Sequence, residues 1–144
     1  MNVTNLDSNT KCLKLSKEEL SVISSSLIEF NQEMHWALKK SLNEDVFKEG
    51  FSKKYNFFWR DLEYIEDALS ELDFNLRNIN ITEITIYFSK KMLKKPKIIY
   101  VALNECSKNY EDYEISIRTG IARQELDIVL KEFKEKIIDK MEKL

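Results

Sequence analysis

Apolar positions recur at intervals of three and four residues along most of the chain, which is the spacing of one face of an α-helix. The longest such stripe follows Ser16, and Glu19 stands three residues further on, as in a capping box that begins a helix. Lys39 and Lys40 suit the C-terminal end of this helix, where cations are favoured. Its predicted inner positions are Leu20, Ile23, Leu27, Phe30, Met34 and Leu38.

A more regular stripe follows further along the chain. A short segment is predicted from Asn43 to about Gly50, and Ser52 is predicted to cap the helix after it. The inner positions of that helix are Phe58, Leu62, Ile65, Leu69 and Leu72. Pro96 fits the first turn of another helix. A final helix is predicted over residues 123–141, with Leu126, Leu130, Phe133 and Ile137 facing inward.

Two segments fit this helical pattern poorly. Residues 1–14 are polar and aperiodic, which predicts a flexible N-terminal arm. Ile84, Ile86 and Phe88 alternate as in a strand, whereas Ile81, Ile84, Phe88 and Met92 repeat as in a helix. A helix is favoured, because no second strand is evident to pair with. We therefore predict an all-α fold, a single compact domain of five to six helices over residues 15–144, with a short irregular or strand-like element near 81–88 as the alternative.

Composition supports a helical protein and excludes several classes of function. The chain has two glycines and one proline, too few for the many turns of a β fold. It lacks the apolar stretch of ~20 residues that spans a bilayer, and its first residues lack a signal-peptide pattern. We expect a cytoplasmic protein. Cys12, Cys106 and the single histidine, His35, form no metal-binding or nucleophile spacing, so we predict no catalytic residue, no cofactor and no metal site.

Charge is distributed unevenly although the net charge is only −2. Such a balance disfavours general nucleic-acid binding, which needs a basic surface. On the predicted helix through residues 58–72, acidic residues fall opposite the apolar stripe, and a second acidic group surrounds Tyr113. Either group can be a solvated helix face or a docking surface for a basic protein, in which aromatic residues supply affinity. The predicted partner-binding residues are Trp59, Glu63, Tyr64, Glu66, Asp67, Glu71, Glu111, Asp112, Tyr113 and Glu114.

The segment from residue 102 to residue 126 carries a motif around the second glycine. Gly120 can adopt a positive φ and so separate the short element YEDYEISIR from the last helix. The sequence ALNE, then an aromatic-acidic stretch, an arginine two residues before a glycine, and a Glu-Leu helix resembles a motif of bacterial immunity proteins against polymorphic or contact-dependent growth-inhibition toxins. The matching residues are Ala102, Leu103, Asn104, Glu105, Tyr113, Glu114, Arg118, Gly120, Arg123, Glu125 and Leu126.

The match departs from the family pattern in places and covers about the last quarter of the chain. Cys106 falls one place early, Lys108-Asn109 stands for Asn-Gly, and Ile117 stands for threonine. The resemblance implies a protein that binds and neutralises a cognate toxin domain, such as a nuclease acting on transfer RNA, by blocking its basic active cleft. It further implies a monomer in the free state that needs no cofactor and contacts neither nucleic acid nor membrane directly.

Two alternatives remain from other functional classes. The glycine turn before a helix that begins Arg123-Gln124 is also typical of a helix-turn-helix DNA-binding regulator. Acidic residues at Glu125 and Asp127 on that helix oppose contact with phosphates. A structural adaptor protein would need no feature beyond the predicted helical core and acidic faces.

Overall fold

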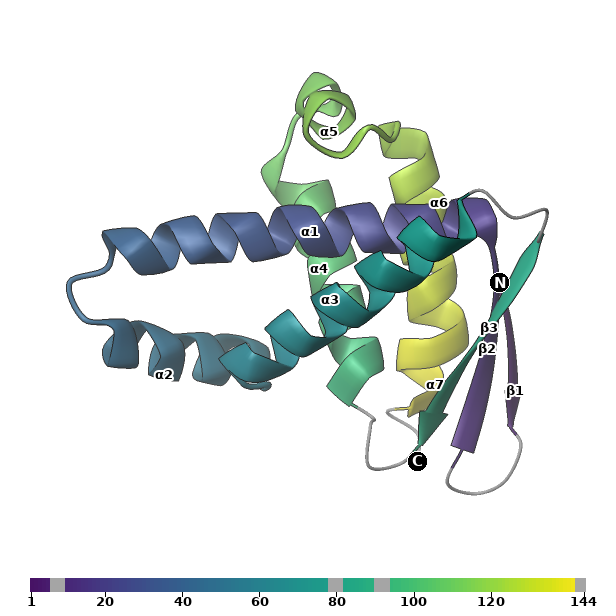
Figure 1. Cartoon of the computed structure of the whole chain (residues 1–144), viewed down its shortest axis with the longest axis horizontal. Helices are drawn as coiled ribbons and strands as arrows, with labels where there is room; N and C mark the ends of the chain where they lie inside the picture. The colour runs from purple at the N-terminus through teal and green to yellow at the C-terminus, as the bar shows by residue number, and fades with distance from the viewer. Residues whose placement is uncertain (6–9, 78–81, 90–93, 142–144) are drawn as a thin grey trace.

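The predicted helical domain is confirmed, with a small sheet added at one end (Figure 1). The computed structural model describes residues 1–5, 10–77, 82–89 and 94–141. The elements are β1 (Asn2–Asn5), β2 (Thr10–Ser16), α1 (Lys17–Lys40), α2 (Glu44–Tyr55), α3 (Trp59–Leu76), β3 (Glu83–Ser89), α4 (Lys94–Asn109), α5 (Asp112–Thr119) and α6 (Arg123–Phe133). A π-helical turn over Lys134–Ile138 and α7 (Asp139–Met141) continue α6 without a break.

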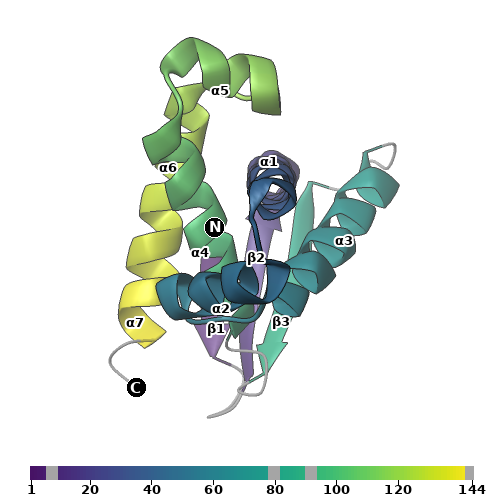
Figure 2. The ribbon, with the colours of Figure 1, turned by 90° about the vertical axis from the view of Figure 1, so that its left-hand side faces the viewer.

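Helix α1 is the central element of the domain. Figure 2 shows it nearly end-on, with α3 on one side and α4 and α6 on the other. The predicted capping box begins it, since Ser16 Oγ accepts from the Glu19 amide at 3.1 Å and Glu19 Oε1 accepts from the Ser16 amide at 3.0 Å. Its predicted stripe enters the core, with Leu20, Ile23, Leu27 and Phe30 buried and Met34 and Leu38 partly buried.

The N-terminal arm and the helix favoured for residues 81–88 are both wrong, and for one reason. The sheet has the order β1-β2-β3, and both pairs are antiparallel. Leu13 and Leu15 of β2 pair with Ile86 and Ile84 of β3 and turn one face of the sheet toward the helices. The partner strand that residues 83–89 needed therefore lies in the segment predicted to be flexible. Ile81 and Met92, which completed the helical pattern, lie outside the described residues.

The predicted end of the second helix near Gly50 is also wrong. Helix α2 continues to Tyr55, past the predicted cap at Ser52, and Asn56 closes it with a left-handed φ of 61°. Phe51 and Tyr55 hold the added turn, because their rings contact Phe30 of α1 at centroid distances of 6.4 and 5.5 Å. Packing against α1 thus outweighs the local cost of a glycine within a helix.

The C-terminal predictions are confirmed with small differences. Pro96 lies in the first turn of α4, and α5 is a helix that ends at Gly120, whose φ is 73°. The last helix spans the predicted residues, with Leu126, Phe133 and Ile137 buried and Leu130 partly buried. Helix α5 contacts α1 and α6, so it forms a short cover beside the middle of α1 (Figure 1).

Candidate functional site

The predicted acidic face of α3 divides into a buried and an exposed part. Trp59 is only 7% exposed, and its ring lies between Phe51 and His35, at centroid distances of 5.1 and 5.0 Å. Its indole N–H donates to Glu63 Oε1 at 2.9 Å, and His35 Nε2 lies 3.3 Å from the same oxygen. The prediction that Trp59 contacts a partner is therefore wrong, because this side chain is packed into the core.

The remaining predicted residues of α3 lie on its outer side. Tyr64, Asp67 and Glu71 are exposed and Glu66 is half-buried. Burial, together with the neighbouring Asp67, raises the pKa of the Glu66 carboxyl, even though the Ser70 hydroxyl donates to Glu66 Oε1 at 3.2 Å. This part of the face has the exposure that a contact surface requires.

The second predicted group lies at the start of α5. Glu111 and Asp112 are exposed, as is Tyr113, whereas Glu114 is half-buried. Glu114 Oε1 accepts from the Glu111 amide at 3.4 Å and so caps α5, and Asp112 pairs with Arg123. Figure 2 shows α3 and α5 on different sides of α1, so the structure does not bring the two predicted groups together.

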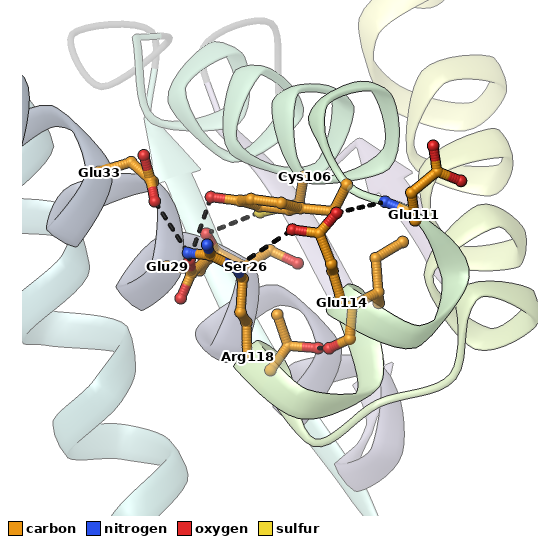
Figure 3. Close-up of polar contacts among 10 residues, drawn as sticks. Ser26, Glu29, Glu33, Cys106, Glu111, Glu114 and Arg118 are labelled. Atoms are coloured by element: carbon orange, nitrogen blue, oxygen red, sulfur yellow. Dashed lines mark hydrogen bonds and ion pairs between the residues drawn. The ribbon is translucent and has the colours of Figure 1, made fainter.

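Arg118, which carries much of the sequence resemblance, turns inward from α5 to α1 (Figure 3). Its Nη1 donates to Glu29 Oε1 at 3.0 Å and to Glu33 Oε1 at 2.9 Å. The Tyr110 hydroxyl donates to the same Glu29 oxygen at 3.0 Å, and the Tyr110 ring lies 4.7 Å from the guanidinium carbon. Hydrogen bonding to Glu29 raises the pKa of Arg118, and burial and the Glu29 charge raise the pKa of Tyr110.

Glu29 is the centre of this cluster, since it is only 5% exposed. A buried carboxylate is stable only when charged partners and hydrogen-bond donors compensate for the loss of water. Arg118 and Tyr110 supply both, one from α5 and the other from the turn before it. The ion pair therefore fixes the position of α5 on α1.

Other motif residues also hold the scaffold together. Arg123 Nη1 donates to the Ser107 carbonyl at 2.9 Å, and its Nη2 donates to the Tyr110 carbonyl. These contacts satisfy the Ser107 carbonyl in the last turn of α4, where helical carbonyls lack partners within the helix, and the Tyr110 carbonyl just beyond it. Ala102, Leu103 and Leu126 are buried in the core, and Gly120 provides the left-handed residue that ends α5.

A groove opens between α1 and α5 next to this cluster, and we call it the α1–α5 groove. It encloses about 690 Å³ and is lined by Glu29, Gln32, Glu33, Trp36, Ile117 and Arg118. Trp36 is 57% exposed and Ile117 is 79% exposed, so its walls include apolar surface open to solvent. A second cavity of about 290 Å³ shares Glu33 and Arg118 with the groove and extends to Glu105.

The sequence prediction missed this groove. Glu29, Gln32, Glu33 and Trp36 are separated by three, one and three residues, which places them on one face of α1. That spacing was a usable signal for a polar and aromatic helix face. Nothing in the spacing indicated that Arg118, 85 residues after Glu33, would lie against it.

The cysteine thiols and the possible metal ligands give less evidence of a functional site than the groove does. Burial, followed by the charge of Glu29, raises the pKa of Cys106 to about 12, and its Sγ lies 3.5 Å from the Ser26 carbonyl oxygen. Within the described ranges, no group of three or more His, Cys, Asp or Glu side chains is arranged to hold a metal ion. The described helices include none that is both long and apolar enough to cross a membrane.

No protein-family model, no curated protein and no solved structure matches this chain.

Proposed function

We propose that this protein is an immunity protein, which binds a cognate toxin domain and blocks its active cleft. The observation that supports this proposal best is the α1–α5 groove, where an acidic floor meets exposed Trp36 and Ile117. Glu111 and Tyr113 at the start of α5 are also exposed, and they form a further acidic and aromatic candidate for contact. An acidic surface that presents aromatic side chains fits the basic cleft of a nuclease, including one that acts on transfer RNA.

The proposed mechanism is occupation without turnover. Carboxylates of the inhibitor take positions that substrate phosphates would occupy, and complementary charge accelerates the encounter of the two proteins. Apolar contacts by Trp36 and Ile117 then slow dissociation, because large side chains at the centre of an interface carry most of its binding energy. The exposed face of α3, with Tyr64 and Glu71, is a separate candidate surface on another side of α1.

The two alternative functions predict different partners. In the helix-turn-helix alternative, Arg123 would contact bases, but here it donates to backbone carbonyls of Ser107 and Tyr110. Glu125 and Asp127 lie exposed on the same helix and would repel phosphates. A structural adaptor remains compatible with the acidic surfaces, and its partner would be a protein other than a toxin.

The test begins with the reading frames next to the gene for this chain, and a candidate toxin domain encoded there is co-expressed with it. We expect cells that produce both proteins to survive and the two proteins to purify as one complex. The triple variant Glu66→Lys, Asp67→Lys and Glu71→Lys examines the α3 face, and the variant Glu33→Lys examines the groove. Loss of protection in one of them, with folding unchanged by circular dichroism, identifies the contact surface. Failure of the wild-type chain to protect would overturn the immunity function, as would sequence-specific binding of duplex DNA by the protein alone.

A further inference from the structure

We infer that the α1–α5 groove is a receptor for a single arginine side chain of the protein partner. The inference rests on the proposed function for the identity of that partner, the toxin domain. The groove itself supplies the evidence for the residue type, through its charge, its walls and its floor.

Charge in and around the groove is incompletely balanced. Arg118 is the cation among the lining residues, and it faces Glu29 and Glu33 at 3.0 and 2.9 Å. Glu114 Oε2 lies 3.8 Å from Arg118 Nε, and Glu105 lines the cavity that continues from the groove. Three carboxylates, those of Glu29, Glu33 and Glu114, therefore contact one guanidinium, and Lys40 is the other cation beside the groove, on the Trp36 ring. A second cation would be attracted to this position, whereas a phosphate would be repelled.

Glu33 is the residue placed to receive the incoming cation. Its side chain remains 38% exposed even while it pairs with Arg118. A carboxylate has about four positions at which it can accept hydrogen bonds, so one contact with Arg118 leaves Glu33 able to accept from the solvent side. Glu29 is buried behind it and adds negative potential without offering an open face.

The walls of the groove suit the stem and plane of an arginine. Trp36 on α1 and Ile117 on α5 present apolar surface to the methylene groups, and a guanidinium can stack on an indole ring. Lys40 Nζ lies 3.6 Å from the centroid of the Trp36 ring, so an incoming guanidinium would replace this ammonium on the indole. Arginine is favoured over lysine because its planar fork can bind a carboxylate and stack at the same time.

The test uses short peptides, so that it does not depend on the toxin. Acetyl-Gly-Arg-Gly-amide is titrated into the ¹⁵N-labelled protein, and acetyl-Gly-citrulline-Gly-amide serves as the uncharged control of nearly equal shape. The chain has two tryptophans, so the indole region of the spectrum reports Trp36 beside the groove and Trp59 in the core. We expect the arginine peptide to shift the Trp36 signal saturably, with a dissociation constant on the order of 1 mM, while the Trp59 signal stays in place. The lysine analogue should bind more weakly, and the citrulline peptide should leave both signals unchanged.

Matched variants locate the site. We expect Glu33→Gln and Trp36→Ala each to weaken arginine-peptide binding at least about fivefold. Because Trp36→Ala lacks the reporter indole, binding by both variants and by the wild-type protein is followed through the backbone amide signals of Gln32 and Ile117, which line the groove. Glu71→Gln makes the same change of charge on α3 and should leave binding unchanged. Equal responses to the arginine and citrulline peptides, or equal losses in Glu33→Gln and Glu71→Gln, would overturn the inference.

The same variants separate this inference from the immunity function. If the arginine peptide binds and the wild-type chain fails to protect cells, arginine binding by the groove is supported and the toxin is not its source. A second outcome separates the two in the other direction. If Glu33→Gln and Trp36→Ala no longer bind the arginine peptide and still protect cells as well as the wild-type chain does, the immunity function holds. The inference that the groove receives an arginine of the toxin is then refuted.

Discussion

The two glycines of this chain should respond in opposite directions to the same substitution. Gly120 ends α5 with a φ of 73°, whereas Gly50 lies inside α2 with no positive φ. A Cβ atom added at either position would meet no atom of another part of the chain within 4 Å. The effect of alanine therefore comes from the backbone conformation and not from crowding by neighbouring side chains.

The expected magnitudes follow from that difference. Alanine at Gly120 must adopt a left-handed conformation, which we expect to lower the free energy of unfolding by about 1 kcal/mol after the reduced entropy of the unfolded chain is included. Alanine at Gly50 improves helix propensity and should raise the free energy of unfolding by roughly 0.5–1 kcal/mol. Gly120→Asn should cost less than Gly120→Ala, because asparagine tolerates this conformation, as Asn56 does at the end of α2.

Urea unfolding followed by circular dichroism measures all three variants under one set of conditions. The midpoints of Gly120→Ala and Gly50→Ala should move to opposite sides of the wild-type midpoint with similar slopes. A stabilising effect of Gly120→Ala would refute the left-handed turn after α5. That result would also remove the geometric basis for the groove, because this turn sets the direction in which α5 presents Ile117 to α1.

Three further predictions concern charge and titration. Arg118→Ala leaves the buried carboxylate of Glu29 without its cation, so we expect the urea midpoint of this variant to fall below wild type and that of Arg118→Lys, which keeps the charge, to lie between the two; a midpoint of Arg118→Ala equal to wild type would show that this ion pair does not hold α5 on α1. Burial and the neighbouring Asp67 raise the pKa of Glu66 above its ordinary 4.5, so the stability linked to its protonated form is present below that pH and lost as the pH rises through the folded-state pKa. Glu66→Gln should accordingly stabilise the protein by about a few tenths of a kcal/mol at pH 7 and have no effect at pH 4, and a destabilised variant at pH 7 would contradict this. Burial, followed by the Glu29 charge, raises the pKa of Cys106 to about 12, so this thiol should react with a disulfide reagent at pH 8 at least about a hundredfold more slowly in the native protein than in urea, and comparable rates would show that it is accessible.

The sequence predicted the helices well because their signals are local. The Ser16 capping box and the stripe that follows it lie within a few residues of one another and specify α1 without reference to the rest of the chain. The sheet was missed because its evidence is divided between distant segments. The alternation in β2 is limited to Leu13 and Leu15, and its partner β3 begins only at Glu83. A short strand becomes recognisable only when its partner is known.

The difference between local signals and signals divided between distant segments also explains which site residues were predicted correctly. Helical periodicity correctly placed Asp67 and Glu71 on the outer side of α3, because which side of a helix a residue occupies follows from spacing alone. It misplaced Trp59, since the aromatic side chains that bury this residue come from α1 and α2. The groove could not be found in this way, because its two walls come from helices that are far apart in the sequence.

The residues that match the family motif hold the scaffold together, whereas the exposed apolar residues of the groove are not among the matching residues, and this difference bears on partner choice. Gly120 and Arg123 shape and fasten the turn around α5, and Arg118 closes the ion pair with α1. Trp36 stands outside the motif, Ile117 occupies the motif position at which the family pattern has threonine, and both side chains are exposed. Residues that fix a scaffold can be shared by proteins with different partners, whereas exposed apolar residues at the centre of an interface determine which partner binds. Under the proposed immunity function, substitutions at Trp36 and Ile117 should therefore change which toxin domain is bound and leave unfolding midpoints close to wild type, while substitutions at Arg118 and Arg123 should lower those midpoints first.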